Sequence, residues 1–177
     1  TLRTVAGPVE TTLVGALCGF LVAFGIGRPI FFVCLTMLYA NGVEYAYLPI
    51  AIVITNYVAM GVALGYAFKN KGEERQVGIT SFVACALGGV SEPTWFGIWL
   101  GNKKAMLSSV IGGAVAGLAI GVMNVGYYQF GPSNFLSVLG YVSADVPNNL
   151  LHGCIAAALG IIVTFLMMVV FYKKEEK

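Results

Sequence analysis

Charged residues are scarce in this sequence. Of its 177 residues, 10 are Lys or Arg and 8 are Asp or Glu, so charged side chains make up 10% of the chain, whereas ordinary soluble domains carry about 25%. Hydrophobic residues make up 58%, and the mean hydropathy is +0.85. A soluble domain of this length does not have enough interior to bury so much apolar surface. The composition therefore excludes an ordinary soluble domain and predicts an all-α polytopic membrane protein.

Histidine and clustered cysteine are also missing. The chain has one histidine, His152, and its four cysteines stand singly in apolar stretches. No two cysteines have metal-ligand spacing, and a Cys/His cluster cannot form around one histidine. We therefore predict no metal and no cofactor, cysteines that act as small buried hydrophobic residues, and a histidine that marks the start of the last helix.

The net charge of +2 is small, and the basic residues stand in short clusters beside apolar segments. This arrangement is typical of membrane topology signals and does not indicate a nucleic-acid surface.

Four apolar runs are long enough to cross a membrane as helices, which takes about 20 residues and at least about 17. The predicted spans are 11–27, 45–68, 105–126 and 150–172. Span 105–126 is rich in glycine and alanine, so we expect it to pack closely against neighbouring helices rather than against lipid.

The basic residues predict the orientation of these spans, because Lys and Arg collect on the cytoplasmic side. Segment 127–149 has no Lys or Arg and should lie outside, whereas Lys173, Lys174 and Lys177 should place the C-terminus in the cytoplasm. Counting back from there, the second span should start outside and the first span inside. The short apolar segment 30–40 would then be an arm that dips into the membrane from outside.

Segment 77–101 contains two apolar stretches that are each too short to cross a membrane. They are separated by the sequence Gly88-Gly89-Val90-Ser91-Glu92-Pro93. Basic residues stand before and after the segment: Lys69, Lys71, Arg75, Lys103 and Lys104. Because they mark one face of the membrane, we interpret 77–101 as a re-entrant hairpin with Glu92 near its tip.

An ionisable residue at that depth indicates a functional site, and non-helical backbone there must be surrounded by protein or a water-filled cavity. The alternative is one spanning helix that is kinked at Pro93, with Glu92 neutralised by protonation. With the hairpin, the chain would have four spans and two short re-entrant elements of opposite orientation. Transporters often build a substrate site where such broken elements meet.

The stretch Gly89-Val90-Ser91-Glu92-Pro93, followed by Phe96-Gly97-Ile98 and Lys103-Lys104, resembles the Gly-Ile-Thr/Ser-Glu-Pro signature of a family of sugar permeases. These are the membrane IIC subunits of the bacterial phosphoenolpyruvate-dependent phosphotransferase system, in the glucose/β-glucoside/sucrose superfamily. The resemblance covers residues 8–172 but only the last half of a typical IIC subunit. The chain also begins at Thr1 within polar sequence, so we expect a piece of a longer permease.

The resemblance implies a single membrane domain over 1–177 that binds and carries the sugar. It implies a location in the bacterial cytoplasmic membrane among its lipids. The implied partners are cytoplasmic IIB and IIA proteins or domains, and a second copy that dimerises through an N-terminal half missing from this chain. The phosphorylatable cysteine motif of the B domain is absent, so we predict no catalytic residue in the chain itself.

The resemblance makes Glu92 a ligand of sugar hydroxyls, with Pro93 shaping the tip and Ser91 beside them as a further candidate. A carboxylate suits this role, because it offers about four acceptor sites and makes strong charge-assisted hydrogen bonds. The family usually carries a histidine in the upstream short arm, where this chain has Arg28 instead. Arg28 either pairs with Glu92 or binds the sugar, or it extends to the outer membrane interface.

Three other residues are candidates near the site. Trp95 and Trp99 share a helical face and either pack or anchor at the membrane interface, or else stack on a sugar ring, with Trp95 the better candidate ligand. Asn56 lies in the middle of a span and should bridge two helices or face the cavity.

The leading prediction is therefore a sugar-translocating subunit of a phosphotransferase system. One alternative is an ion- or proton-coupled secondary transporter in which Glu92 titrates, and another is an inactive fragment or scaffold half of a permease.

Overall fold

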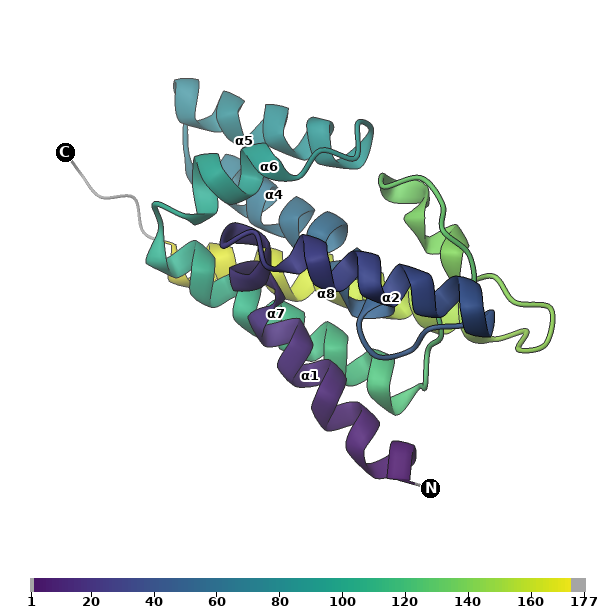
Figure 1. Cartoon of the computed structure of the whole chain (residues 1–177). Coiled ribbons are helices and arrows are strands. Elements are labelled where there is room, and N and C mark those ends of the chain that lie inside the picture. Colours follow the sequence, from purple (N-terminus) through teal and green to yellow (C-terminus); the bar gives the residue numbers. More distant parts are fainter. Residues whose placement is uncertain (1, 173–177) are drawn as a thin grey trace.

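The computed structural model describes residues 2–172 and is built from helices (Figure 1). In this described part it has eight α-helices: α1 (Leu2–Ala23), α2 (Gly27–Asn41), α3 (Leu48–Ile52), α4 (Ala59–Lys69), α5 (Gly72–Ala86), α6 (Glu92–Thr94), α7 (Lys103–Val122) and α8 (Asn149–Phe171). There are also two π-helical segments, η1 (Val53–Val58) and η2 (Trp95–Trp99), and one 3-10 helix, η3 (Phe135–Tyr141). The all-α prediction is confirmed. The predicted cytoplasmic residues Lys173, Lys174 and Lys177 lie outside the described residues.

Four helical stretches are long and apolar enough to cross a membrane, as the sequence predicts. They are Ala6–Ala23, Leu48–Lys69, Lys103–Val122 and Asn149–Phe171. The second stretch joins α3, η1 and α4 into one continuous helix. It forms the core of the protein, since 89% of its most apolar 18-residue stretch is buried. The corresponding share is 22% for Ala6–Ala23 and 28% for Asn149–Phe171.

The glycine-rich helix α7 packs closely against its neighbours, which confirms the prediction for this span. A methyl group on Gly113 would collide with the carbonyl oxygen of Gly15, and one on Gly117 would collide with that of Thr11. These contacts let the backbones of α7 and α1 approach each other, as small residues do in membrane helices. Helix α8 packs against α7 as well.

The predicted direction of the first span is wrong relative to the rest of the chain. Pro8 lies against Gly121 and Gly15 lies against Gly113, so α1 runs antiparallel to α7 and begins at the end of the bundle where α7 finishes. Helix α2 then leads back toward that same end (Figure 1). The prediction treated segment 30–40 as a short arm that returns to its starting side. The structure has instead one 15-residue helix over Gly27–Asn41, about 22 Å long.

The boundary between α1 and α2 also differs from the predicted one. Helix α1 ends at Ala23, and the turn that follows has Gly25 at a φ of 75°, a conformation that favours glycine. Arg28 and Pro29 lie in the first turn of α2. Proline is tolerated there because the first backbone N–H groups of a helix have no partner within it.

The segment around Glu92 consists of two short helical pieces that fold back on each other (Figure 1). Helix α5 ends at Ala86, residues 87–91 form a turn in which Gly89 has a φ of 68°, and α6 and η2 continue from Glu92 to Trp99. The helix is interrupted before Pro93, which does not fit a single helix kinked at that residue. Whether this hairpin enters and leaves a membrane on one face stays a prediction.

The segment after α7 is held against the N-terminal part of the core helix. Its backbone pairs with the loop before α3, since the N–H of Tyr127 donates to the oxygen of Glu44 at 2.7 Å and the N–H of Glu44 donates back at 2.9 Å. Burial raises the pKa of the Tyr127 hydroxyl to about 12, so this group stays protonated. The hydroxyl of Tyr57 donates to the oxygen of Phe135 at 2.7 Å. These contacts hold segment 127–149 beside the core helix.

Candidate functional site

A cavity of about 350 Å³ lies between α2, the start of the core helix, the turn 87–91 and the loop after α7. This is at the lower end of the range for small-molecule sites, about 300–1,000 Å³. Its polar lining includes Arg28, Thr55, Asn56, Ser91, Glu92 and Ser133. Its aromatic lining consists of Phe31, Tyr47, Phe96 and Phe130. A cavity with apolar walls and a few converging polar groups is typical of a small-molecule site.

Glu92 reaches this cavity because a new helix begins beside it. The carbonyl oxygen of Ser91 accepts hydrogen bonds from the N–H groups of Thr94 at 3.0 Å and Trp95 at 3.1 Å, which starts the turn. Pro93 is in the first turn of this helix and is exposed. The positive end of a helix dipole favours a carboxylate in the first turn. Ser91 and Glu92 line the cavity, whereas Pro93 only shapes the backbone.

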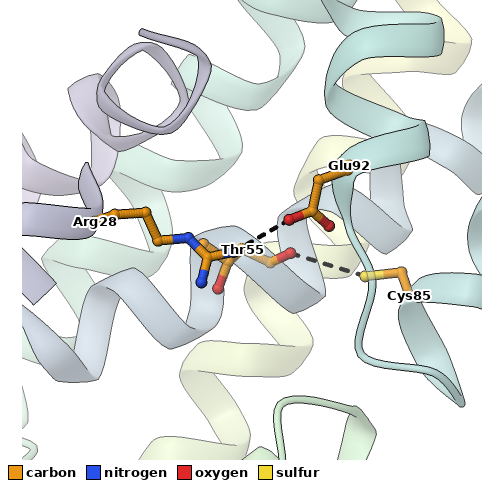
Figure 2. A network of polar contacts seen from close by, with 4 residues as sticks. All are labelled: Arg28, Thr55, Cys85 and Glu92. Carbon is orange, nitrogen blue, oxygen red and sulfur yellow. Dashed lines mark hydrogen bonds and ion pairs between the residues drawn. The ribbon is translucent and has the colours of Figure 1, made fainter. Parts of the chain in front are cut away.

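Arg28 and Glu92 form an ion pair across the cavity (Figure 2). Nη2 of Arg28 lies 3.1 Å from Oε1 of Glu92, and the side chains are 76% and 49% exposed within the chain. Of the two alternatives for Arg28, the structure therefore shows the pair with Glu92. An exposed pair contributes little to stability, typically about 0–1 kcal/mol.

The pair leaves most of its hydrogen-bonding capacity unused. In the described part of the chain, the bond between Nη2 and Oε1 is the one hydrogen bond that these two side chains make. A guanidinium has five N–H donors, and a carboxylate has about four acceptor sites. Several donors and acceptors therefore remain for a ligand rich in hydroxyl groups.

The floor of the cavity is formed where the core helix widens into the π-helical segment η1. Asn56 is 2% exposed and donates from Nδ2 to Oγ of Ser137 at 3.3 Å. Sγ of Cys85 lies 3.8 Å from the carbonyl oxygen of Thr55 (Figure 2). It also lies 3.3 Å from the carbonyl oxygen of Asn56. Asn56 thus bridges two elements and lines the cavity, so both alternatives for this residue hold. Widened helical turns occur frequently at functional sites.

The two tryptophans do not line the cavity. Trp95 and Trp99 are 0% and 1% exposed, their ring centroids are 5.5 Å apart, and Nε1 of Trp99 donates to Oγ of Ser109 at 2.6 Å. They pack against α1, where Gly19 provides room for both rings. The packing alternative is what the structure shows, and we no longer count Trp95 among the candidate ligands.

The aromatic side chain that reaches the cavity from this segment is Phe96, which was not predicted as a site residue. The sequence could have indicated Phe96 as a site residue, because it stands four residues after Glu92 and residues four apart share a helical face. Tyr47, Phe31 and Phe130 come from three separate segments and carry no local motif. Their place in the site follows only from the tertiary packing.

Neither the histidine nor any of the four cysteines lines the cavity, although Cys85 packs behind Thr55 and Asn56, which do. His152 is near the start of α8, as predicted, and does not line the cavity. Cys18 and Cys85 are fully buried, and Cys34 and Cys154 are partly buried. All four are free thiols.

Comparison with curated proteins finds distant relatives. The chain is 25% identical over 169 residues to the PTS system arbutin-, cellobiose-, and salicin-specific EIIBC component of Escherichia coli, a match that covers 94% of this chain and 34% of that protein. It is 28% identical over 123 residues to the PTS system glucose-specific EIIBCA component of Corynebacterium glutamicum, and 25% identical over 123 residues to a mannose-specific EIIBCA component of the same species. Each of these two matches covers 67% of this chain and 18% of the relative.

No family model matches the chain, and no solved structure matches it significantly. The chain spans about a third of the length of the E. coli relative and about a fifth of the other two. The resemblance predicted from the signature residues is nevertheless confirmed at this level. The chain is similar, at 25–28% identity, to part of the EIIBC and EIIBCA components of the phosphotransferase system.

Proposed function

We propose that this chain is the sugar-binding part of a phosphotransferase permease and that the sugar binds in the cavity beside Arg28 and Glu92. The observation that carries the proposal is the pair itself. The carboxylate of the permease-like signature faces a 350 Å³ cavity and is held 3.1 Å from a guanidinium whose other donors make no hydrogen bond within the described chain. A sugar carries several hydroxyl groups, and each of them can both donate and accept a hydrogen bond. The donors of Arg28 and the acceptors of Glu92 can bind such hydroxyl groups together.

The aromatic lining supports the same ligand class. The C–H face of a sugar ring is apolar and suits an aromatic surface. Phe31, Phe96 and Phe130 supply such surfaces, and the centroids of Phe31 and Phe130 are 5.7 Å apart in an edge-to-face arrangement. In this proposal Ser91, Thr55 and Asn56 add polar contacts around the ring.

The proposed transport cycle uses the hairpin 77–101 as a re-entrant element in the bacterial cytoplasmic membrane. The sugar enters from the side of segment 127–149, and a cytoplasmic IIB partner that receives its phosphoryl group from IIA phosphorylates the bound sugar. The phosphorylated sugar is then released inside, and dimerisation through the N-terminal half of a IIC subunit belongs to the same proposal. The relatives are named for arbutin, cellobiose, salicin, glucose and mannose, so these five compounds form the panel to test.

Uptake into membrane vesicles that contain the protein and the soluble phosphotransferase proteins tests this function. We expect uptake of at least one panel compound to require phosphoenolpyruvate, to persist when an uncoupler collapses the proton gradient, and to yield the sugar phosphate inside. Uptake that is independent of phosphoenolpyruvate and is abolished by the uncoupler would indicate a proton-coupled transporter instead.

A further inference from the structure

Helix α2, which carries Arg28, makes few buried contacts with the rest of the described chain. Of its 15 residues, only Gly27 and Leu38 are buried. Phe32, Val33 and Met37 are 61%, 59% and 52% exposed, and the side chains that face the core, such as Phe31 and Leu35, are only partly buried. The hydrogen bond that ties this helix to another element next to Arg28 is at Gly27.

That contact is made by Tyr47. Its hydroxyl donates to the carbonyl oxygen of Gly27 at 3.2 Å, and its side chain is 6% exposed. Gly27 immediately precedes Arg28, and all three residues line the cavity. A hydrogen bond to the backbone one residue before Arg28 restricts where the guanidinium can reach.

Tyr47 is in turn held by Glu44, a buried carboxylate in the turn before the core helix that was not predicted as a site residue. Oε1 of Glu44 accepts from the N–H of Ala46 at 2.7 Å, and Oε2 accepts from the N–H groups of Tyr47 at 3.1 Å and Leu48 at 2.7 Å. These are N–H groups at the start of the core helix, which have no partners within it, and their bonds to a carboxylate are charge-assisted. Glu44 is 7% exposed, so water competes little for them.

We propose that Glu44 and Tyr47 are positioning residues for the ligand site. Glu44 fixes the backbone of Tyr47 at the start of the core helix, the Tyr47 hydroxyl fixes the carbonyl of Gly27, and this places Arg28 within reach of Glu92. The inference rests on the proposed function only in that the Arg28–Glu92 pair binds the sugar; the positioning of the pair is a property of the chain without sugar.

The matched variants are Tyr47→Phe and Tyr141→Phe. Each removes one buried hydroxyl that donates to a backbone carbonyl and keeps the ring, but the hydroxyl of Tyr141 donates to Pro49 at 2.7 Å and does not line the cavity. Glu92→Gln serves as the reference in which the ion pair is absent.

The first readout needs no sugar. Phenylglyoxal modifies arginine, and peptide mapping by mass spectrometry reports the rate at Arg28, with Arg75 as the internal reference. We expect Glu92→Gln to raise the rate at Arg28 several-fold, Tyr47→Phe to raise it toward the same value, and Tyr141→Phe to leave it unchanged. Glu44→Gln, which keeps one acceptor oxygen but loses the charge, should have an effect in the same direction as Tyr47→Phe. The wild-type rate in Tyr47→Phe, an equal rise in Tyr141→Phe, or no rise in Glu92→Gln would overturn the proposal.

The second readout is the affinity for the panel compound that binds best, measured by titration calorimetry in detergent. Tyr47→Phe should weaken binding several-fold in the wild-type background and have no further effect when Arg28 is already Gln. An equal loss in both backgrounds would mean that Tyr47 contacts the sugar directly. If none of the five compounds binds, or if Arg28→Gln and Glu92→Gln leave their affinities unchanged, the proposed function fails, while the modification rates still decide the positioning role.

Discussion

At the scale of single residues, the site depends on two opposite charges that share one hydrogen bond. An isolated charge is costly wherever water is excluded, and a paired charge avoids much of that cost. Arg28 and Glu92 form such a pair, with Nη2 and Oε1 3.1 Å apart. The remaining donors of Arg28 and acceptors of Glu92 are available to a ligand in the cavity, and the two opposite charges balance each other.

Phe96 is the residue whose role follows most directly from its place in the cavity. Replacing Phe96 with Ala removes one apolar wall, and we expect the affinity for a bound panel compound to fall about five- to tenfold, which corresponds to about 1–1.4 kcal/mol. Equilibrium binding to the purified protein measures this. Leu100→Ala is the matched control, because Leu100 is in the same segment, is 50% exposed, and does not line the cavity. An equal loss of affinity in both variants would mean that Phe96 acts through the fold and not at the cavity.

At the scale of helices, glycines let the backbones of α1 and α7 approach each other closely. Gly113→Ala places a methyl group against the carbonyl of Gly15 and should destabilise the protein by about 1–3 kcal/mol, as overpacking does. The measurement is the thermal unfolding midpoint in detergent. Gly97→Ala is the control, since nothing lies within 4 Å of a methyl group there, and alanine is up to about 1 kcal/mol better than glycine in a helix. A midpoint that Gly113→Ala leaves unchanged would show that α1 does not pack on α7 in this way.

The hairpin makes a separate prediction about the membrane. Cysteines introduced at the exposed positions Lys71 and Lys103, just before α5 and at the start of α7, should react with an impermeant thiol reagent only from the cytoplasmic side of sealed vesicles. A cysteine at the exposed position Ala144 should react only from the opposite side. The reason is that the pieces on either side of the turn 87–91 are each too short to cross. Labelling of Lys71→Cys and Lys103→Cys from opposite sides would show that segment 77–101 spans the membrane.

At the scale of the whole molecule, the features that the sequence predicts are those set by local pattern. Apolar runs of about 20 residues predict the four membrane helices, because length and hydropathy alone determine whether a helix can cross. The break before Glu92 is also local, since two glycines and a proline within six residues interrupt a helix. The signature around Glu92 then predicts a site in a segment that lines the cavity.

The features that the sequence does not predict depend on contacts between distant segments. The direction of α1 is set by its packing against Gly113 and Gly117 of α7, and nothing within segment 11–27 itself specifies it. The cavity is lined by α2, the core helix, the hairpin and the loop after α7, so residues such as Tyr47 and Phe130 carry no signal in their own segments. Glu44 was missed for the same reason, because its role depends on N–H groups that are free only once the core helix has formed.

The measurement that tests the central claim most directly is sugar binding to Glu92→Ala, compared with Glu73→Ala as a control that removes an exposed carboxylate from the start of α5. Losing the acceptor should cost at least about 1–3 kcal/mol per sugar hydroxyl left unpaired, so binding of the preferred panel compound should fall below detection. Glu92→Gln should have a smaller effect, because one acceptor oxygen and the shape remain, and Glu73→Ala should bind as the wild type does. Near-normal affinity in a correctly inserted and folded Glu92→Ala protein would contradict the assignment of this cavity as the sugar site.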